Sequence, residues 1–146
     1  SRRGRPQPPF HRVHAVKDLA TVVPAARWLI LAAPLTPETR RLVGPHVLSR
    51  CRAAFLINVA RGGLLDTTAL LSAIENGTLV GAVLDVFEEE PLPADSPLWL
   101  APGVLITPHI AGVTHVAEAA EGFLDALTKL EADGTGPAVV DPAHGY

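Results

Sequence analysis

The sequence contains no methionine and only one cysteine, Cys51, among its 146 residues. A single cysteine can form neither an internal disulfide nor a multi-cysteine zinc site, and this usage is typical of a reducing compartment such as the cytoplasm. Because even an initiating methionine is missing, and no predicted element precedes the opening Ser-Arg-Arg-Gly, we expect an incomplete polypeptide. It would be a fragment, a separately encoded half or the remainder of a longer chain.

Long apolar runs and a strong net charge are also missing. The longest apolar runs, such as residues 28–33, are far shorter than the roughly 20 residues of a membrane-spanning helix. A formal net charge of −3 gives no general attraction to nucleic acid or anionic lipid, so we expect neither as a partner. The 48% of hydrophobic and 18% of charged residues are typical of one soluble globular domain or a piece of a larger one.

Apolar segments alternate with helical patterns along the chain. Continuous apolar segments of the kind found in strands buried on both faces occupy residues 26–33, 53–60, 79–86 and 103–106. Short helices are predicted at residues 17–23 and 45–50, and a longer one from Asp66 or Thr67 to Asn76-Gly77. Crossovers of this length require a parallel sheet with helices covering its faces. The predicted fold class is α/β.

A long amphipathic helix is predicted at residues 114–131. Its apolar side chains recur at helical spacing, among them Val116, Phe123, Leu124, Leu127 and Leu130. We expect this apolar stripe to be exposed unless a partner covers it.

Three polar positions follow predicted strands, where parallel sheets bind their ligands. Arg61 precedes Gly62-Gly63, a pair that lets the backbone approach a ligand, and its guanidinium is a planar fork suited to a carboxylate. His109 is suited to acid-base chemistry near neutral pH, and an acidic stretch at residues 85–90 lies between the two. Taken singly, these residues could equally be a surface arginine, a solvated acidic loop and a hydrogen-bonded core histidine.

Together these segments resemble the D-isomer-specific 2-hydroxyacid dehydrogenase family along nearly the whole chain. The resemblance is carried in order by PLTPET (34–39), INVARGG (57–63), LDVFEEEP (84–91) and TPHIAG (107–112). The ending VDPAHGY (140–146) is similar to the glyoxylate and hydroxypyruvate reductase-like branch. The resemblance implies a Rossmann-like parallel sheet with flanking helices.

The resemblance also implies an activity and its catalytic residues. Hydride would pass between NAD(P)H and a small 2-oxoacid such as glyoxylate or hydroxypyruvate to give a D-2-hydroxyacid. Arg61 would clamp the substrate carboxylate and carbonyl. His109 would give or take the proton, and the negative charge of its partner Glu90 would favour the imidazolium form.

Cofactor contacts are implied at matching positions. They are Pro34, Thr39, Val59, Ala60, Arg61, Asp85, His109 and Gly112, with Asp85 near the nicotinamide. Pro34 could equally just end a strand, Thr39 just start a helical turn and Asp85 just cap a loop. Arg2 and Arg3 resemble the segment after the second strand of the nucleotide fold, where arginine suits the extra phosphate of NADP. NADP is therefore preferred and NAD possible, although these arginines could equally form just a basic terminus.

The sequence departs from the family in its missing parts. No G-x-G-x-x-G occurs, so the first strand, the glycine-rich loop and most of the substrate domain are absent, and this segment alone should bind cofactor weakly.

Residues 1–112 would be the C-terminal portion of the NAD(P)-binding Rossmann domain. Residues 113–146 would be the helix and tail that return to the substrate domain, and the full-length form would be a homodimer.

Other interpretations remain open. Corepressors of the C-terminal-binding-protein type resemble the same family, so a dinucleotide-sensing interaction module is an alternative, as is an inactive fragment. Formate dehydrogenases of this fold generally carry Gln where Glu90 stands, which argues against that activity. The remaining histidines lack metal-ligand spacing, so we predict no metal. Arg50 and Arg52 could lower the thiol pKa of Cys51, but we predict no nucleophilic role for it.

Overall fold

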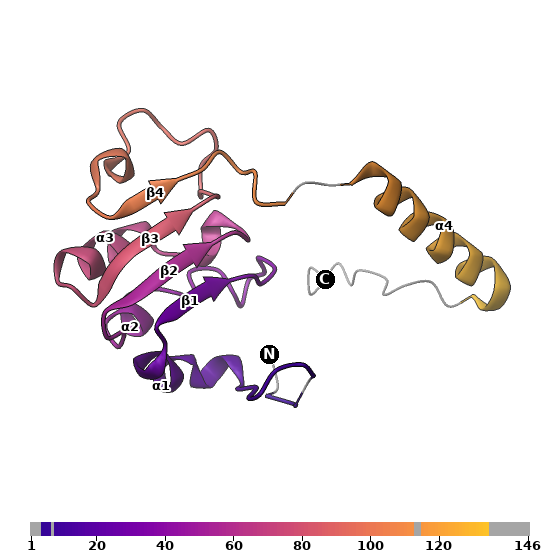
Figure 1. Cartoon of the computed structure of the whole chain (residues 1–146), viewed down its shortest axis with the longest axis horizontal. Helices are drawn as coiled ribbons and strands as arrows, with labels where there is room; N and C mark the ends of the chain where they lie inside the picture. Colours follow the sequence, from indigo (N-terminus) through magenta and orange to yellow (C-terminus); the bar gives the residue numbers. More distant parts are fainter. Residues whose placement is uncertain (1–3, 7, 113–114, 135–146) are drawn as a thin grey trace.

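The computed structural model describes residues 4–6, 8–112 and 115–134. Its centre is a four-stranded sheet in the order β1-β2-β3-β4 (Figure 1). The strands are β1 (Trp28–Leu31), β2 (Ala54–Asn58), β3 (Leu79–Leu84) and β4 (Val104–Ile106). All neighbouring pairs are parallel, which confirms the predicted α/β fold. Each strand is shorter than the segment that predicted it, because the apolar runs continue into the loops beyond the paired residues.

Short helical segments connect the strands. The helix predicted at residues 17–23 is instead three pieces, η1 (Val16–Asp18), α1 (Leu19–Val22) and η2 (Val23–Ala25). Pro24 cannot donate a helical hydrogen bond, which accounts for the end of α1 at Val22. The second, α2 (Pro45–Leu48), ends earlier than predicted. Two turns of 3₁₀ helix, η3 (Gly62–Leu64) and η4 (Pro97–Leu100), were not predicted.

The helix α3 (Thr67–Glu75) begins and ends where the sequence indicated. The Asp66 carboxylate accepts a hydrogen bond from the N–H of Ala69 at 2.9 Å, so Asp66 rather than Thr67 is the N-cap. At the other end Asn76 is the C-cap, and Gly77 follows with a φ of +76°. That positive φ is costly for any residue with a Cβ, which explains why the stop falls at Asn76-Gly77.

One face of the sheet forms the hydrophobic core. Side chains of β1, β2 and β3 that alternate along each strand are buried together with apolar side chains of α2 and α3. They include Leu29, Leu31, Leu56, Leu84, Val47, Leu48 and Leu70. This packing fixes the carboxyl ends of the strands, from which the candidate site residues extend.

The other face of the sheet is largely exposed. Trp28 is 61% exposed, Ile30 58% and Leu105 59%, and the Trp28 ring contacts that of Phe55 at a centroid distance of 5.3 Å. The expectation of strands buried on both faces is therefore wrong for the described residues. Successive side chains of a strand point to opposite faces, and α2 and α3 pack on only one of them.

The last helix, α4 (Val116–Asp133), confirms the predicted amphipathic helix and lies apart from the sheet (Figure 1). Its apolar residues Val116, Phe123, Leu124, Leu127 and Leu130 are all exposed, as expected in the absence of a partner. None of the helices in the described part of the chain is long and apolar enough to cross a membrane.

Candidate active site

The loops that follow the strands enclose a hollow of about 290 Å³ at the carboxyl edge of the sheet. The three predicted catalytic side chains, Arg61, Glu90 and His109, all line it. The rest of the lining is Leu35, Arg40, Gly62, Gly63, Phe87 and Glu88. The structure thus brings together Arg61 and His109, which lie 48 positions apart in the sequence.

The loop after β2 and the loop after β3 meet at Gly62. A Cβ atom on Gly62 would lie 1.9 Å from the carbonyl carbon of Phe87 and 2.3 Å from the nitrogen of Glu88. No side chain fits in that space, so glycine is required for the two backbones to approach this closely. This contact sets the separation between Arg61 on one loop and Glu90 on the other.

Arg61 is placed by Asn58, a buried asparagine for which no role was predicted. Asn58 is 0% exposed; its amide nitrogen donates to the carbonyl of Arg61 at 3.1 Å, and its amide oxygen accepts from the N–H of Ala60 at 3.2 Å. The Arg61 guanidinium is exposed and donates to the carbonyl of Ala60 at 2.6 Å. The sequence feature that could have indicated this role is a polar residue at the end of an otherwise apolar strand.

Glu90 and His109 are joined by a hydrogen bond at the hollow. Oε2 of Glu90 lies 2.8 Å from Nδ1 of His109, and Oε1 accepts a hydrogen bond from the N–H of Phe87 at 2.8 Å. The Phe87 hydrogen bond, followed by that of His109, holds the pKa of Glu90 below its usual range despite partial burial. The nearby charge of Arg61 adds to this effect. A negative charge therefore lies beside the imidazole at neutral pH.

Asp85 fixes the loop that carries His109. The carboxylate is 1% exposed and accepts hydrogen bonds from the Thr107 hydroxyl, from the N–H of Ile110 at 2.9 Å and from the N–H of Ala111 at 2.8 Å. Burial acts to raise the pKa of Asp85, but these bonds and the charge of His109 outweigh it, so the pKa is lowered. His109 has a φ of +54°, a conformation that needs such support.

Four of the predicted cofactor contacts line a second hollow of about 660 Å³ at the ends of β1 and β2. They are Pro34, Val59, Ala60 and Arg61, with Ala32, Ala33 and Leu35. Apart from Arg61 these side chains are small or apolar, which fits the flat ring of a nicotinamide. The donors and acceptors on this wall are mainly backbone groups.

The other predicted cofactor contacts lie elsewhere. The Thr39 hydroxyl closes its own turn, since it donates to the carbonyl of Pro34 at 2.8 Å and accepts from the N–H of Thr36 at 2.7 Å. Gly112 is exposed, and an added Cβ there would meet no atom within 4 Å. Arg2 and Arg3 lie outside the described residues.

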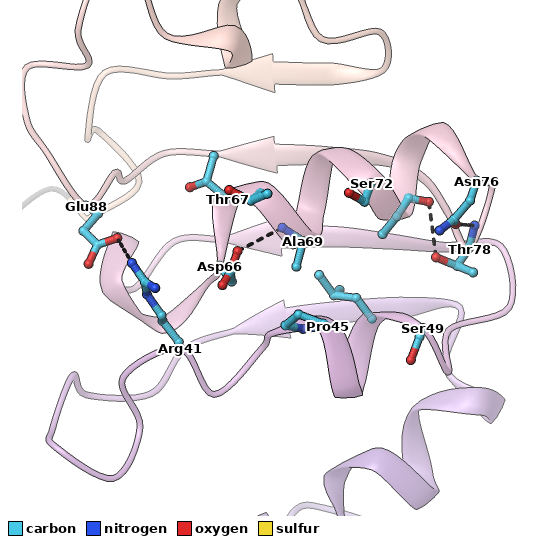
Figure 2. Close-up of a pocket in the computed structure, with 13 residues that line it drawn as sticks. Arg41, Pro45, Ser49, Asp66, Thr67, Ala69, Ser72, Asn76, Thr78 and Glu88 are labelled. Atoms are coloured by element: carbon cyan, nitrogen blue, oxygen red, sulfur yellow. Dashed lines mark hydrogen bonds and ion pairs between the residues drawn. The ribbon is translucent and has the colours of Figure 1, made fainter.

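A polar groove of about 490 Å³ lies between α2 and α3 (Figure 2). Its lining includes Arg41, Ser49, Asp66, Thr67, Ser72 and Glu88, and none of the predicted site residues.

The expectation that neighbouring arginines lower the pKa of Cys51 is wrong, because burial raises the pKa of this thiol. No group of three His, Cys, Asp or Glu side chains within the described ranges could hold a metal ion.

Comparisons with known proteins agree with this arrangement. Residues 1–111 match the family model for the NAD binding domain of D-isomer specific 2-hydroxyacid dehydrogenases. Glyoxylate/hydroxypyruvate reductase A of Escherichia fergusonii is 42% identical over 131 residues, which are 89% of this chain and 42% of that protein. The chain thus spans less than half the length of this curated relative.

Two solved structures are similar over the whole chain. A D-isomer specific 2-hydroxyacid dehydrogenase from Xanthobacter autotrophicus, in complex with NADPH and MES, is 38% identical with a TM-score of 0.87, and 61% of it is covered. An NADPH-dependent glyoxylate/hydroxypyruvate reductase from Sinorhizobium meliloti, in complex with NADP and sulfate, is 30% identical with a TM-score of 0.88, and 48% of it is covered. Both similarities extend over 100% of the present chain.

Proposed function

Because the chain belongs to the D-isomer specific 2-hydroxyacid dehydrogenase family, we propose that its protein transfers hydride between NAD(P)H and a small 2-oxoacid. The product would be a 2-hydroxyacid, of D configuration where its C2 is a stereocentre, and glyoxylate and hydroxypyruvate are the substrates that the named relatives suggest. The observation that carries the proposal is the meeting of Arg61, Glu90 and His109 around one hollow. Arginine, carboxylate and histidine are what reduction of a 2-oxoacid requires.

Arg61 binds and polarises the substrate in this proposal. Its guanidinium is permanently charged and presents parallel N–H donors, which match the carboxylate of a 2-oxoacid. The same group stabilises negative charge that develops on the carbonyl oxygen as the carbonyl is reduced. Its bond to the carbonyl of Ala60 keeps the guanidinium close to its own loop.

His109 holds the proton. Because Nδ1 faces Glu90, Nε2 is the ring nitrogen left to give a proton to the carbonyl oxygen or to take one from a hydroxyl. Reduction starts from the imidazolium and the reverse reaction from the neutral ring. Glu90 acts through His109 by orienting the ring.

The chain's residues also suggest how the cofactor is held. Pro34, Val59 and Ala60 would form an apolar wall beside the nicotinamide, and a bound nicotinamide supplies the hydride. We propose NADP as the preferred cofactor, from Arg2 and Arg3 and from the NADP complexes of the relatives. Thr39, Asp85 and Gly112 stay predicted contacts.

The proposal also assigns two regions of the chain. Residues 1–112 would be the C-terminal portion of the NAD(P)-binding domain, and residues 113–146 the helix and tail that pack on a substrate domain. The exposed apolar residues of α4 support this division, because an amphipathic helix of this kind requires a covering surface.

The test is the oxidation of NADPH and of NADH with glyoxylate, hydroxypyruvate and pyruvate. We would compare the intact protein, the present segment, His109→Ala and His46→Ala, since His46 is an exposed histidine of α2 outside the hollow. Turnover by the intact protein that is lost in His109→Ala and kept in His46→Ala supports the proposal. Dinucleotide binding without reduction of any 2-oxoacid would instead support a sensing module.

A further inference from the structure

Two consecutive arginines share one glutamate at the edge of the hollow. Nη1 of Arg40 lies 3.1 Å from Oε1 of Glu88, and Nη2 of Arg41 lies 3.5 Å from Oε2 of the same carboxylate. The two side chains nevertheless face different spaces. Arg40 lines the hollow with Arg61 and His109, whereas Arg41 reaches Glu88 from the groove between α2 and α3 (Figure 2).

Backbone geometry keeps the two arginines apart. Arg41 has a φ of +51°, and its N–H donates to the carbonyl of Gly63 at 2.8 Å, so its backbone is held in a left-handed conformation against the loop after β2. The Arg40 guanidinium lies over the same glycine, since a Cβ on Gly63 would be 3.5 Å from its Nη1. Arg40 and Arg61 therefore flank the same glycine turn.

Arg40 has N–H donors that Glu88 does not use, and its positive charge is only partly balanced. A guanidinium carries five N–H donors, and among the described residues Glu88 is the only acceptor paired with Arg40. One carboxylate also faces two guanidinium groups, so the three side chains together carry one excess positive charge. The hollow thus contains a second cationic group that the catalytic roles of Arg61, Glu90 and His109 do not use.

Taking the proposed function as a premise, we propose that Arg40 is a specificity-determining residue that binds a hydrogen-bond acceptor on C3 of the 2-oxoacid. Arg61 engages the carboxylate and the carbonyl, which leaves the C3 substituent to face another wall of the hollow. Glyoxylate has no C3, and C3 of pyruvate is a methyl group, which offers no hydrogen-bond acceptor. The hydroxyl of hydroxypyruvate and the second carboxylate of oxaloacetate are acceptors for a guanidinium.

The test uses the ratio of kcat/KM for hydroxypyruvate to that for pyruvate, because these substrates differ by one hydroxyl group. The ratio is measured for the intact wild-type protein, Arg40→Met and Arg41→Met. Methionine keeps an unbranched side chain and removes the donors, and each variant removes one partner of Glu88. We expect the ratio to fall about tenfold in Arg40→Met, as for loss of a hydrogen bond to a charged group. In Arg41→Met it should change by less than about twofold.

The outcomes separate this inference from the proposed function. A wild-type protein that reduces no 2-oxoacid overturns both. An active wild type whose ratio is the same in Arg40→Met overturns the inference alone. An equal fall in both variants also overturns it, because the arginines would then act only through Glu88.

A third variant covers the case in which Arg40→Met does not fold. Glu88→Gln removes the carboxylate that Arg40 shares with Arg41 and should raise the kcat/KM for oxaloacetate relative to pyruvate by about two- to fivefold. A thermal unfolding curve for each variant identifies loss of folding. An unchanged oxaloacetate preference in folded Glu88→Gln overturns the inference.

Discussion

Nδ1 of His109 lies 2.8 Å from Oε2 of Glu90, while the second oxygen of Glu90 accepts a hydrogen bond from the N–H of Phe87. The carboxylate is therefore fixed at one end by backbone and at the other by the imidazole. A fixed carboxylate holds the ring in one orientation and one tautomer. The geometry of this pair should consequently decide the rate of catalysis.

Glu90→Gln should lower the rate of 2-oxoacid reduction by about tenfold or more, because the amide keeps a similar shape but lacks the charge. Because hydrogen bonds hold the pKa of Glu90 below its usual range, the carboxylate should stay charged from about pH 5.5 to 9, and the rate difference should persist over that interval. The measurement is kcat from about pH 5.5 to 9. The matched control is Glu89→Gln, the exposed neighbour, and identical profiles for the two variants would refute the role of Glu90.

Gly62→Ala should destabilise the protein by about 3 kcal/mol, because its Cβ would overlap the carbonyl carbon of Phe87 and force two backbone segments apart. Urea unfolding measures this change. Gly122→Ala in α4 is the control, since an added Cβ there meets no atom within 4 Å. That substitution should be neutral or stabilise by up to about 1 kcal/mol, so an equal loss in both variants would contradict the prediction.

Asp85→Asn should cost about 1 to 3 kcal/mol of unfolding free energy. The buried carboxylate accepts three hydrogen bonds at its two oxygens, and an amide nitrogen would turn a donor toward one of these donors. Urea unfolding is compared with that of Asp66→Asn, where asparagine serves equally well as a helix N-cap and little change is expected. A loss in Asp66→Asn as large as that in Asp85→Asn would contradict this explanation.

The contribution of Asp85 to stability should depend on pH in a defined direction. Its folded pKa is lowered, so the unfolded chain takes up the proton first as the pH falls below about 4. The stabilisation is complete above that range and is lost as the pH falls through the lowered folded pKa. The difference in unfolding free energy between wild type and Asp85→Asn should thus shrink in acid, and a constant difference from about pH 2.5 to 6 would refute it.

Cys51 should react slowly with iodoacetamide in the native protein. The thiol is 4% exposed, and burial raises its pKa, so both access and the thiolate fraction are low near neutral pH. Mass spectrometry should find alkylation at least about tenfold slower without urea than with it. Equal rates in the two conditions would mean that α2 does not protect the thiol.

The strands were predictable because buried strands consist of continuous apolar residues that can be recognised in the sequence. The apolar runs before Pro34 and Arg61 located β1 and β2, and strand ends of a parallel sheet necessarily gather at one edge. That rule placed Arg61, the acidic stretch at residues 85–90 and His109 together, and the family resemblance singled out Glu90. The exposed face around Trp28 and Ile30 was not predictable, since apolar residues look the same whether or not a partner covers them.

The residues that support the site were harder to predict than the site itself. Asp85 binds backbone groups 25 and 26 positions away, and Arg40 binds Glu88 48 positions away. Periodicity and capping rules describe only near neighbours, so they carry no information on such contacts. Asn58 and Gly62 differ, because a polar residue in an apolar strand and a paired glycine are local signals that can be recognised.

The parallel sheet also has a consequence for how the chain folds. None of the described strand pairs can begin from a tight turn, because each pairing joins residues far apart in sequence, such as Trp28 with Phe55. Loops of this length must close before any strand contact is gained, so sheet formation should be slow. During that interval the unpaired edges of these strands can template the addition of other strands. The recovery of native chain should consequently fall as its concentration during refolding rises.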